Sequence, residues 1–266
     1  MKRSITALLC AFSLASVSNA TTSRTGFVDS ADAKNVALLV GVTYGLPGID
    51  LDLKNVKEIA AHPGYQFDTH ELWEDEGSVL NVAKNLTDLS ASVTDGGTLF
   101  FYFSGHGSTE GLLMSDRVMK IGEIRAAVEK GRVGKAPLQR LVMMFDSCYS
   151  GALLNGVRRV EHKETDTRAS QEFADALVKE LQAGNRAEAY WKKLFVFASS
   201  RADETSAAGS EGSAFTVNMR KAFDEAVLSK AKVSEFVTKA QKYTAAYHHP
   251  VARLVPVTLG DENLVP

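Results

Sequence analysis

The stretch TLFFYFSGHG, residues 98–107, is an apolar run that stops abruptly at Ser-Gly-His-Gly. Such a continuous run is typical of a strand that is buried on both faces of a parallel sheet. LQRLVMMFDS, residues 138–147, has the same form and is followed by Cys148. Chemistry in open α/β sheets gathers at the carboxyl ends of the strands, so both stretches mark candidate functional sites.

Similar apolar runs recur along the chain, separated by segments with the spacing of amphipathic helices. They predict an α/β fold, with a mostly parallel six-stranded sheet that helices flank on both faces. The predicted strands are 35–42, 66–74, 98–104, 138–147, 193–200 and 251–260, and the predicted helices are 51–62, 78–93, 121–130, 214–227 and 233–248. A charged segment at about 156–174 is expected to form an exposed loop between the fourth and fifth strands.

The N-terminus has the pattern of a targeting segment. Residues 1–20, MKRSITALLCAFSLASVSNA, have a basic start, an apolar middle and a Ser-Asn-Ala end. This is the pattern of a secretory signal peptide cleaved after Ala20, and a lipoprotein anchored through Cys10 is the alternative. We therefore expect an exported protein, periplasmic or secreted, whose folded domain spans residues 35–266. Residues 21–34 are either a pro-segment or a disordered tail.

The composition bounds the function. With 45% hydrophobic and 23% charged residues, the chain is an ordinary globular protein. Its net charge of −2 and its lack of a basic block argue against nucleic acid as a partner. No Cys/His cluster has zinc spacing and no glycine motif is suited to phosphate, so we expect no required cofactor. The acidic stretch 71–78 is a candidate calcium site, with an acidic surface loop as the alternative.

Two side chains at the strand ends could act together. Removal of a signal peptide leaves Cys148 as the single cysteine, which is either a reactive thiol or a buried apolar group. The stretch DSCYSGALL predicts a strand-to-helix turn, where helix N–H groups stabilise a thiolate. Of the six histidines, only His106 directly follows a buried strand between two glycines. A histidine in that place can serve as general base for a thiol at a neighbouring strand end.

Ser-Gly-His-Gly after one strand and, about forty residues later, Asp-Ser-Cys-Tyr-Ser-Gly after the next resemble the caspase–hemoglobinase fold. Within that fold the chain is most similar to metacaspases and bacterial caspase-like proteins, from about Val36 to Thr258. The resemblance implies a catalytic dyad of His106 and Cys148. It also implies an oxyanion hole formed by the backbone N–H groups of Gly107 and Cys148, which stabilise the charge that develops on the scissile carbonyl oxygen.

Two carboxylates are expected at the mouth of this site. Asp146 lies two residues before the cysteine, and Asp52 in GLPGIDLDL is the best match to the metacaspase Leu-x-Gly…Asp pattern. Asp50 is the alternative, because Leu51 stands where that pattern has Asn. A carboxylate that merely stabilises a helix N-terminus is a further interpretation of Asp52. Paired carboxylates favour Arg or Lys as the P1 side chain, and the chain lacks the Gln-Ala-Cys signature of caspases.

Further candidates flank this site. Ser199 and Ser200, in FASSRADETS, match the family strand that runs beside the substrate and could hold an extended peptide by β-type pairing. Basic residues in the charged loop are candidates for self-cleavage within 157–170, because they are expected to be exposed to an enzyme that prefers them. These residues are Arg158, Arg159, Lys163 and Arg168.

The sequence therefore predicts an exported cysteine endopeptidase that forms a thioester acyl-enzyme and cleaves peptide or protein substrates after Arg or Lys. Once the signal peptide is removed, no membrane is expected as a partner. Two alternatives stay open: a catalytically idle caspase-like domain that binds a peptide or a partner, and a thiol hydrolase acting on non-peptide esters or amides. The paired carboxylates argue against the hydrolase unless its substrate is cationic.

Overall fold

The computed structural model describes residues 34–108, 110–147, 179, 181, 189–200 and 206–265. Its centre is a six-stranded sheet in the order β10-β7-β6-β3-β1-β2. The strands are β1 (Val36–Val42), β2 (Asp68–Trp73), β3 (Thr98–Gly105), β6 (Leu138–Asp146), β7 (Trp191–Ala198) and β10 (Val251–Val255). β10 runs antiparallel to β7, and every other pairing in this sheet is parallel. The predicted mostly parallel six-stranded sheet is confirmed.

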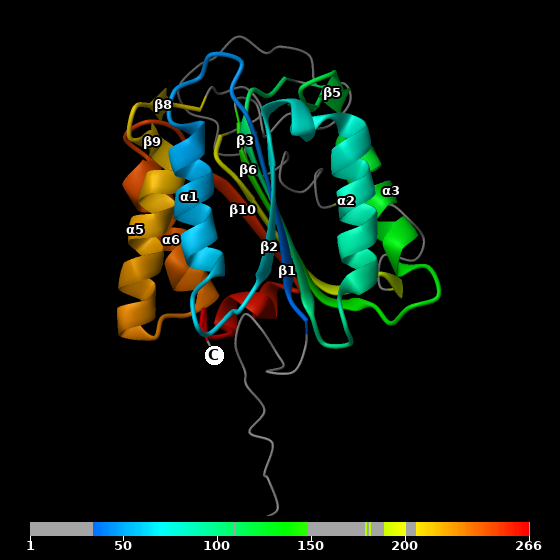
Figure 1. The fold of residues 1–266 in the computed structure, drawn as a ribbon. Coiled ribbons are helices and arrows are strands. Elements are labelled where there is room, and N and C mark those ends of the chain that lie inside the picture. Colours follow the sequence, from blue (N-terminus) through cyan, green and yellow to red (C-terminus); the bar gives the residue numbers. More distant parts are fainter. Residues whose placement is uncertain are drawn as a thin grey trace, which may run out of the picture.

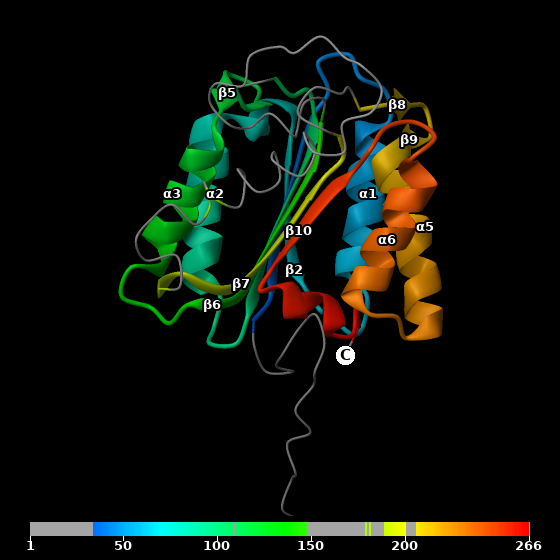
Figure 2. The same cartoon turned by 180° about the vertical axis from the view of Figure 1, so that it is seen from behind.

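Helices cover both faces of the sheet (Figures 1 and 2). One face carries α1 (Ile49–Ala60), α5 (Ala214–Ser229) and α6 (Val233–Thr244), and the other carries α2 (Val79–Ser92) and α3 (Ile121–Arg132). The side chains of β3 alternate between two hydrophobic cores, one on each face of the sheet. Phe101 and Phe103 pack under α2 and α3, and Phe100 and Tyr102 pack under α1 and α5. Burial on both faces explains why the strand sequences are continuously apolar.

The last strand is shorter than the sequence predicted. Pro256 follows β10 and has no backbone N–H to offer the ladder, so the chain leaves the sheet there. Instead of continuing the strand to residue 260, residues Val257–Asp261 form the 3₁₀ helix η4.

Two short hairpins lie at the carboxyl edge of the sheet, on opposite faces (Figure 1). The hairpin of β4 (Leu112–Leu113) and β5 (Val118–Met119) lies above α2 and α3. The hairpin of β8 (Ala208–Gly209) and β9 (Gly212–Ser213) lies beside the start of α1, and its last residue caps α5. A 3₁₀ turn, η1 (Glu74–Gly77), follows β2 at the same edge.

Several predicted features lie outside the described residues. They are the signal peptide 1–20, all of the segment 21–34 but Lys34, Cys148, the charged loop at 156–174, and its cleavage candidates Arg158, Arg159, Lys163 and Arg168. Among the helices that are described, none combines the length and the apolar character that a membrane span requires.

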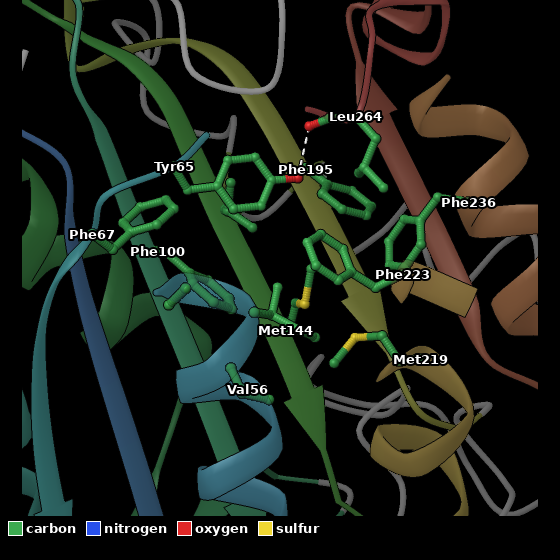
Figure 3. A pocket seen from close by; sticks show the side chains of 13 residues that line it. Val56, Tyr65, Phe67, Phe100, Met144, Phe195, Met219, Phe223, Phe236 and Leu264 are labelled. Atoms are coloured by element: carbon green, nitrogen blue, oxygen red, sulfur yellow. Dashed lines mark hydrogen bonds between the residues drawn. The ribbon is translucent and has the colours of Figure 1, made fainter. Parts of the chain in front are cut away.

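An apolar cavity of ≈ 30 Å³ remains between the sheet and the helices α1, α5 and α6 (Figure 3). Phe100 and Val142 line it from the sheet, and Phe223 lines it from α5. The hydroxyl of Tyr65 at its rim already donates a hydrogen bond to the carbonyl oxygen of Leu264 (2.6 Å). A buried water needs about two to four polar partners, so a cavity with this lining stays dry. We interpret it as a packing defect between the sheet and the helices.

Candidate active site

The carboxyl ends of β1, β3 and β6 lie next to one another. In the parallel register Ser104 of β3 is opposite Asp146 of β6 on one side and Gly41 of β1 on the other. His106 follows Ser104 by two residues, and Cys148, outside the described residues, follows Asp146 by two. The topology therefore brings the two chain segments that lead to the predicted dyad to neighbouring places at this edge.

The backbone around His106 is fixed by close packing. A Cβ on Gly105 would lie 2.5 Å from the carbonyl oxygen of Val42, so only glycine lets β3 end this close to β1. His106 is partly exposed, and its carbonyl oxygen accepts a hydrogen bond from the N–H of Leu113 (3.0 Å). Gly107 lies opposite the β4–β5 hairpin in a bridge whose hydrogen bonds are made by its neighbours. Within the described chain its own N–H has no backbone acceptor, as an oxyanion-hole donor requires.

Asp52, in the first turn of α1, is fully buried, whereas Asp50 is exposed. The carboxylate of Asp52 accepts hydrogen bonds from the hydroxyl of Ser104 (2.8 Å) and from the backbone N–H of Ser213 (2.8 Å). The hydroxyl of Ser213 donates in turn to Asp146, which is 3% exposed. Ser213 therefore bridges the two carboxylates, and the structure brings Asp52, rather than Asp50, to Asp146.

Asp146 is surrounded by hydroxyl groups. Besides Ser213, the hydroxyls of Thr216 (2.6 Å) and Ser206 (3.1 Å) donate to it. The buried phenol of Tyr102 lies 2.6 Å from the Thr216 hydroxyl and extends this network under the sheet edge. Within the described chain every hydrogen-bond partner of the two carboxylates is a hydroxyl or a backbone N–H, and none is a Lys or Arg side chain.

This acidic cluster, defined here as Asp52 and Asp146 with their hydroxyl partners, has unusual electrostatics. Burial, and secondly the charge of Asp146, raise the pKa of Asp52 to about 8, against the opposing effect of the hydrogen bonds from Ser213 and Ser104. Near neutral pH the carboxyl group of Asp52 is therefore largely protonated, unlike an ordinary exposed carboxyl group.

Ser199 and Ser200 lie at the end of β7 with both side chains buried. The hydroxyl of Ser199 accepts a hydrogen bond from the N–H of Ser147 (3.1 Å) and can donate to its carbonyl oxygen (3.2 Å). The hydroxyl of Ser200 lies 3.1 Å from the same carbonyl oxygen. Their side chains therefore hold the residue before Cys148, and their pairing with a substrate backbone stays a prediction.

Sequence reasoning did not assign the hydroxyl side chains of the acidic cluster. They are Tyr102, Ser104, Ser206, Ser213 and Thr216. One signal was present: Ser213 directly precedes the apolar helical run from 214 and accepts from the N–H of Thr216 as its N-cap (3.1 Å).

The acidic stretch 71–78 has other partners. Glu71 pairs with Lys57, and Glu74 accepts a hydrogen bond from the hydroxyl of Thr43 (2.6 Å). In the described ranges, no three His, Cys, Asp or Glu side chains gather as metal ligands do. The described residues therefore offer no set of ligands for the predicted calcium site, which stays a prediction.

Gly212→Ala is expected to disturb the acidic cluster. Gly212 has a φ of 108°, and an added Cβ would lie 2.8 Å from Oδ1 of Asp52. We expect the free energy of unfolding to fall by about 1–3 kcal/mol from the backbone conformation alone, and further from the contact with Asp52. Gly45→Ala is the matched control, because Gly45 has a φ of 89° with nothing within 4 Å of its Cβ position. Equal losses for both variants in chemical denaturation would contradict the steric contact.

Comparisons with known proteins address the fold and the family. A solved structure from Geobacter sulfurreducens, a structural genomics target, matches with a TM-score of 0.57 and 16% identity, over 83% of this chain and 92% of that chain. Caspase-1 from Spodoptera frugiperda matches with a TM-score of 0.53 and 14% identity, over 84% and 88%. At these identities the likeness concerns the fold alone. No curated protein matches the chain.

The family match covers far more than half of the chain. The model of the caspase domain matches residues 34–250, a range that contains all strands of the sheet up to β7, both hairpins and the acidic cluster. The predicted resemblance is confirmed, and this chain belongs to the caspase domain family of cysteine-type peptidases.

Proposed function

We propose that this protein is an exported cysteine endopeptidase that hydrolyses peptide bonds after Arg or Lys. The observation that carries this proposal is the acidic cluster, which places two buried carboxylates without a basic partner in the described chain at the strand ends that lead to His106 and Cys148. The caspase domain supports a cysteine-type peptidase in general. Export is proposed from the signal-peptide pattern of residues 1–20.

Charge decides which P1 side chain suits the acidic cluster. An acidic side chain would add negative charge beside two carboxyl groups that already oppose each other's ionisation, which costs several kcal/mol. A neutral side chain would leave the buried carboxylates without a counter-ion. A guanidinium or ammonium group supplies the missing positive charge, and its N–H groups can use the carboxylate lone pairs that the hydroxyls leave open.

In the proposed reaction His106 takes the proton of the Cys148 thiol, and the thiolate attacks the scissile carbonyl carbon. The N–H groups of Gly107 and Cys148 stabilise the oxyanion of the tetrahedral intermediate. When the C–N bond breaks, His106 returns the proton to the leaving amine and a thioester remains. His106 then deprotonates a water molecule, which attacks the thioester and regenerates the thiol.

Turnover of matched peptide amides with Arg, Lys, Asp or Ala at P1 tests the proposal. We expect cleavage after Arg and Lys only, abolished in Cys148→Ala, because only a cation neutralises the acidic cluster. Cleavage after Asp would keep the peptidase and contradict the specificity. A folded protein with a titratable thiol that cleaves no peptide would support an idle binding domain. Turnover restricted to non-peptide esters or amides would support the thiol hydrolase.

Asp52→Asn is expected to weaken activity and to raise stability at alkaline pH. A P1 cation beside Asp52 would lower the pKa of its carboxyl group and favour its ionised form, which Asn cannot adopt, so we expect kcat/KM to fall by about 100-fold, or roughly 3 kcal/mol. In the wild type, folding raises the pKa of Asp52 from 3.8 to about 8, so the folded state binds more protons than the unfolded state between these values. Stability is therefore lost as pH rises through this window, and Asn has no such loss.

Thermal unfolding at pH 5.5 and pH 9 checks this expectation, because the melting-temperature advantage of Asp52→Asn should be larger at pH 9. Asp50→Asn is the matched control, since Asp50 is exposed on the same helical turn. It should change neither kcat/KM nor the pH dependence of stability. A constant difference between wild type and Asp52→Asn at both pH values would argue against a buried titrating Asp52.

We also propose self-cleavage in the loop 157–170, because it offers basic residues shortly after the nucleophile. The candidates are Arg158, Arg159, Lys163 and Arg168. We expect intact-mass measurements to show fragments cut after one of these residues in the wild type and a single chain in Cys148→Ala. If no cut in 157–170 depends on Cys148, the proposal of self-cleavage is wrong, and cleavage of added peptides is unaffected by that result.

A further inference from the structure

Tyr44 is the aromatic neighbour of His106. The centroids of the two rings lie 6.5 Å apart with an angle of 48° between their planes, and Tyr44 is 51% exposed. Among the described residues, the hydrogen bond recorded for His106 is made by its backbone carbonyl, and no described carboxylate orients its imidazole. The ring of Tyr44 is therefore close enough to limit the orientations that the imidazole of His106 can adopt.

Backbone strain is concentrated at the same place. Four residues other than glycine have a left-handed φ, namely Tyr44 (41°), Gln66 (51°), Glu74 (50°) and Lys230 (52°). Lys230 is the C-cap of α5, where a left-handed residue is ordinary, and Gln66 follows the turn between α1 and β2, away from His106. Tyr44 and Glu74 are different, because both hold the loop after β1: Glu74 accepts hydrogen bonds from the hydroxyl and the N–H of Thr43 (2.6 and 3.4 Å). Strain that surrounding contacts maintain is a marker of functional sites.

The hydroxyl of Tyr44 is tied to the β4–β5 hairpin. It lies within donating distance of the carbonyl oxygens of Ser115 (2.7 Å) and Met114 (3.0 Å). The preceding residue, Leu113, donates its N–H to the carbonyl oxygen of His106 (3.0 Å). One hairpin therefore holds both the far end of the Tyr44 side chain and the backbone from which the His106 side chain extends.

Tyr44 and the acidic cluster act from opposite faces of the sheet. Met114, next to the Tyr44 hydroxyl, packs in the core under α2 and α3. Asp52 lies on α1, which covers the other face, and Ser104 donates to it there. Figure 1 shows the same division, with the β4–β5 hairpin above α2 and α3 and the β8–β9 hairpin beside α1. A change at Tyr44 can therefore alter His106 without altering the P1 site.

We propose that Tyr44 is a positioning residue for His106, whose ring keeps the imidazole oriented to return a proton to the leaving amine. The inference rests on the proposed peptidase function. Its physical basis is that proton transfer needs a donor held within hydrogen-bond reach of the leaving nitrogen, and that a small displacement of a catalytic group lowers the rate steeply.

Two substrates with the same acyl-arginine part separate positioning from a merely structural role. One is a peptide amide, whose amine must be protonated as it leaves, and the other is a nitrophenyl ester, whose phenolate leaves without a proton. We expect Tyr44→Ala to lower kcat for the amide by about tenfold or more and kcat for the ester less, with KM unchanged for both, because the ester still needs His106 to activate the thiol and the water but not to protonate its leaving group. Tyr44→Phe keeps the ring and should retain most of the amide activity.

Asp52→Asn provides the contrasting pattern, a raised KM with an unchanged ratio of amide to ester turnover. Thermal unfolding shows which variants are folded, and Tyr44→Gly, which removes the ring and relieves the left-handed φ, replaces Tyr44→Ala if that variant does not fold. Equal losses on amide and ester, or a change in KM alone, would overturn the inference while leaving the peptidase intact. A wild-type protein that turns over neither substrate would instead contradict the proposed function, and the inference would fall with it.

Discussion

A buried pair of like charges determines how the carboxyl edge of this sheet is built. Asp52 and Asp146 repel each other and are almost completely removed from solvent, so each needs donors from several elements. These donors come from β3, β9, α5 and the chain just before β8, and Ser213 serves both carboxylates while it caps α5. An arrangement of this kind is costly to fold, and such costs are commonly retained at functional sites.

The acidic cluster also demands glycine where α1 meets the β8–β9 hairpin. A Cβ on Gly48, the N-cap of α1, would lie 2.2 Å from the carbonyl oxygen of Gly209. A Cβ on Gly212 would lie 2.8 Å from Oδ1 of Asp52. The helix and the hairpin can therefore come this close only where both have glycine, which has no side chain. This close approach lets the N–H of Ser213 reach the carboxylate of Asp52.

The sequence predicted the parts of the fold that repeat. Strands such as 98–104 can be recognised in the sequence because burial on both faces makes every position apolar, instead of every second position. Asp146 and His106 could be named as candidates because each lies at or just beyond the end of such a strand, where functional sites of parallel sheets occur. The choice between Asp50 and Asp52 could not be made this way. It depends on which side of one helical turn faces β6, and the structure places Asp52 there.

Other parts of the candidate site have no local signature. Ser213 lies 161 positions from Asp52 in the chain, and its two-residue strand is too short to show periodicity. Ser199 and Ser200 were predicted to contact substrate, but only the folded register shows their hydroxyls engaged with Ser147. The left-handed φ of Tyr44 is equally invisible in sequence, because it is imposed by contacts with segments about 30 and 70 residues away.

The parallel ladder between β6 and β7 has a consequence for any chain that is interrupted between them. Each of the two pieces would keep one strand of that ladder, and the ladder is internal to the sheet, flanked by β3 and β10. Asp52, Ser104 and Asp146 would belong to the first piece, and Ser206, Ser213 and Thr216 to the second. The acidic cluster would then become an interface between two polypeptides, so the two pieces would have to remain associated for the cluster to exist at all.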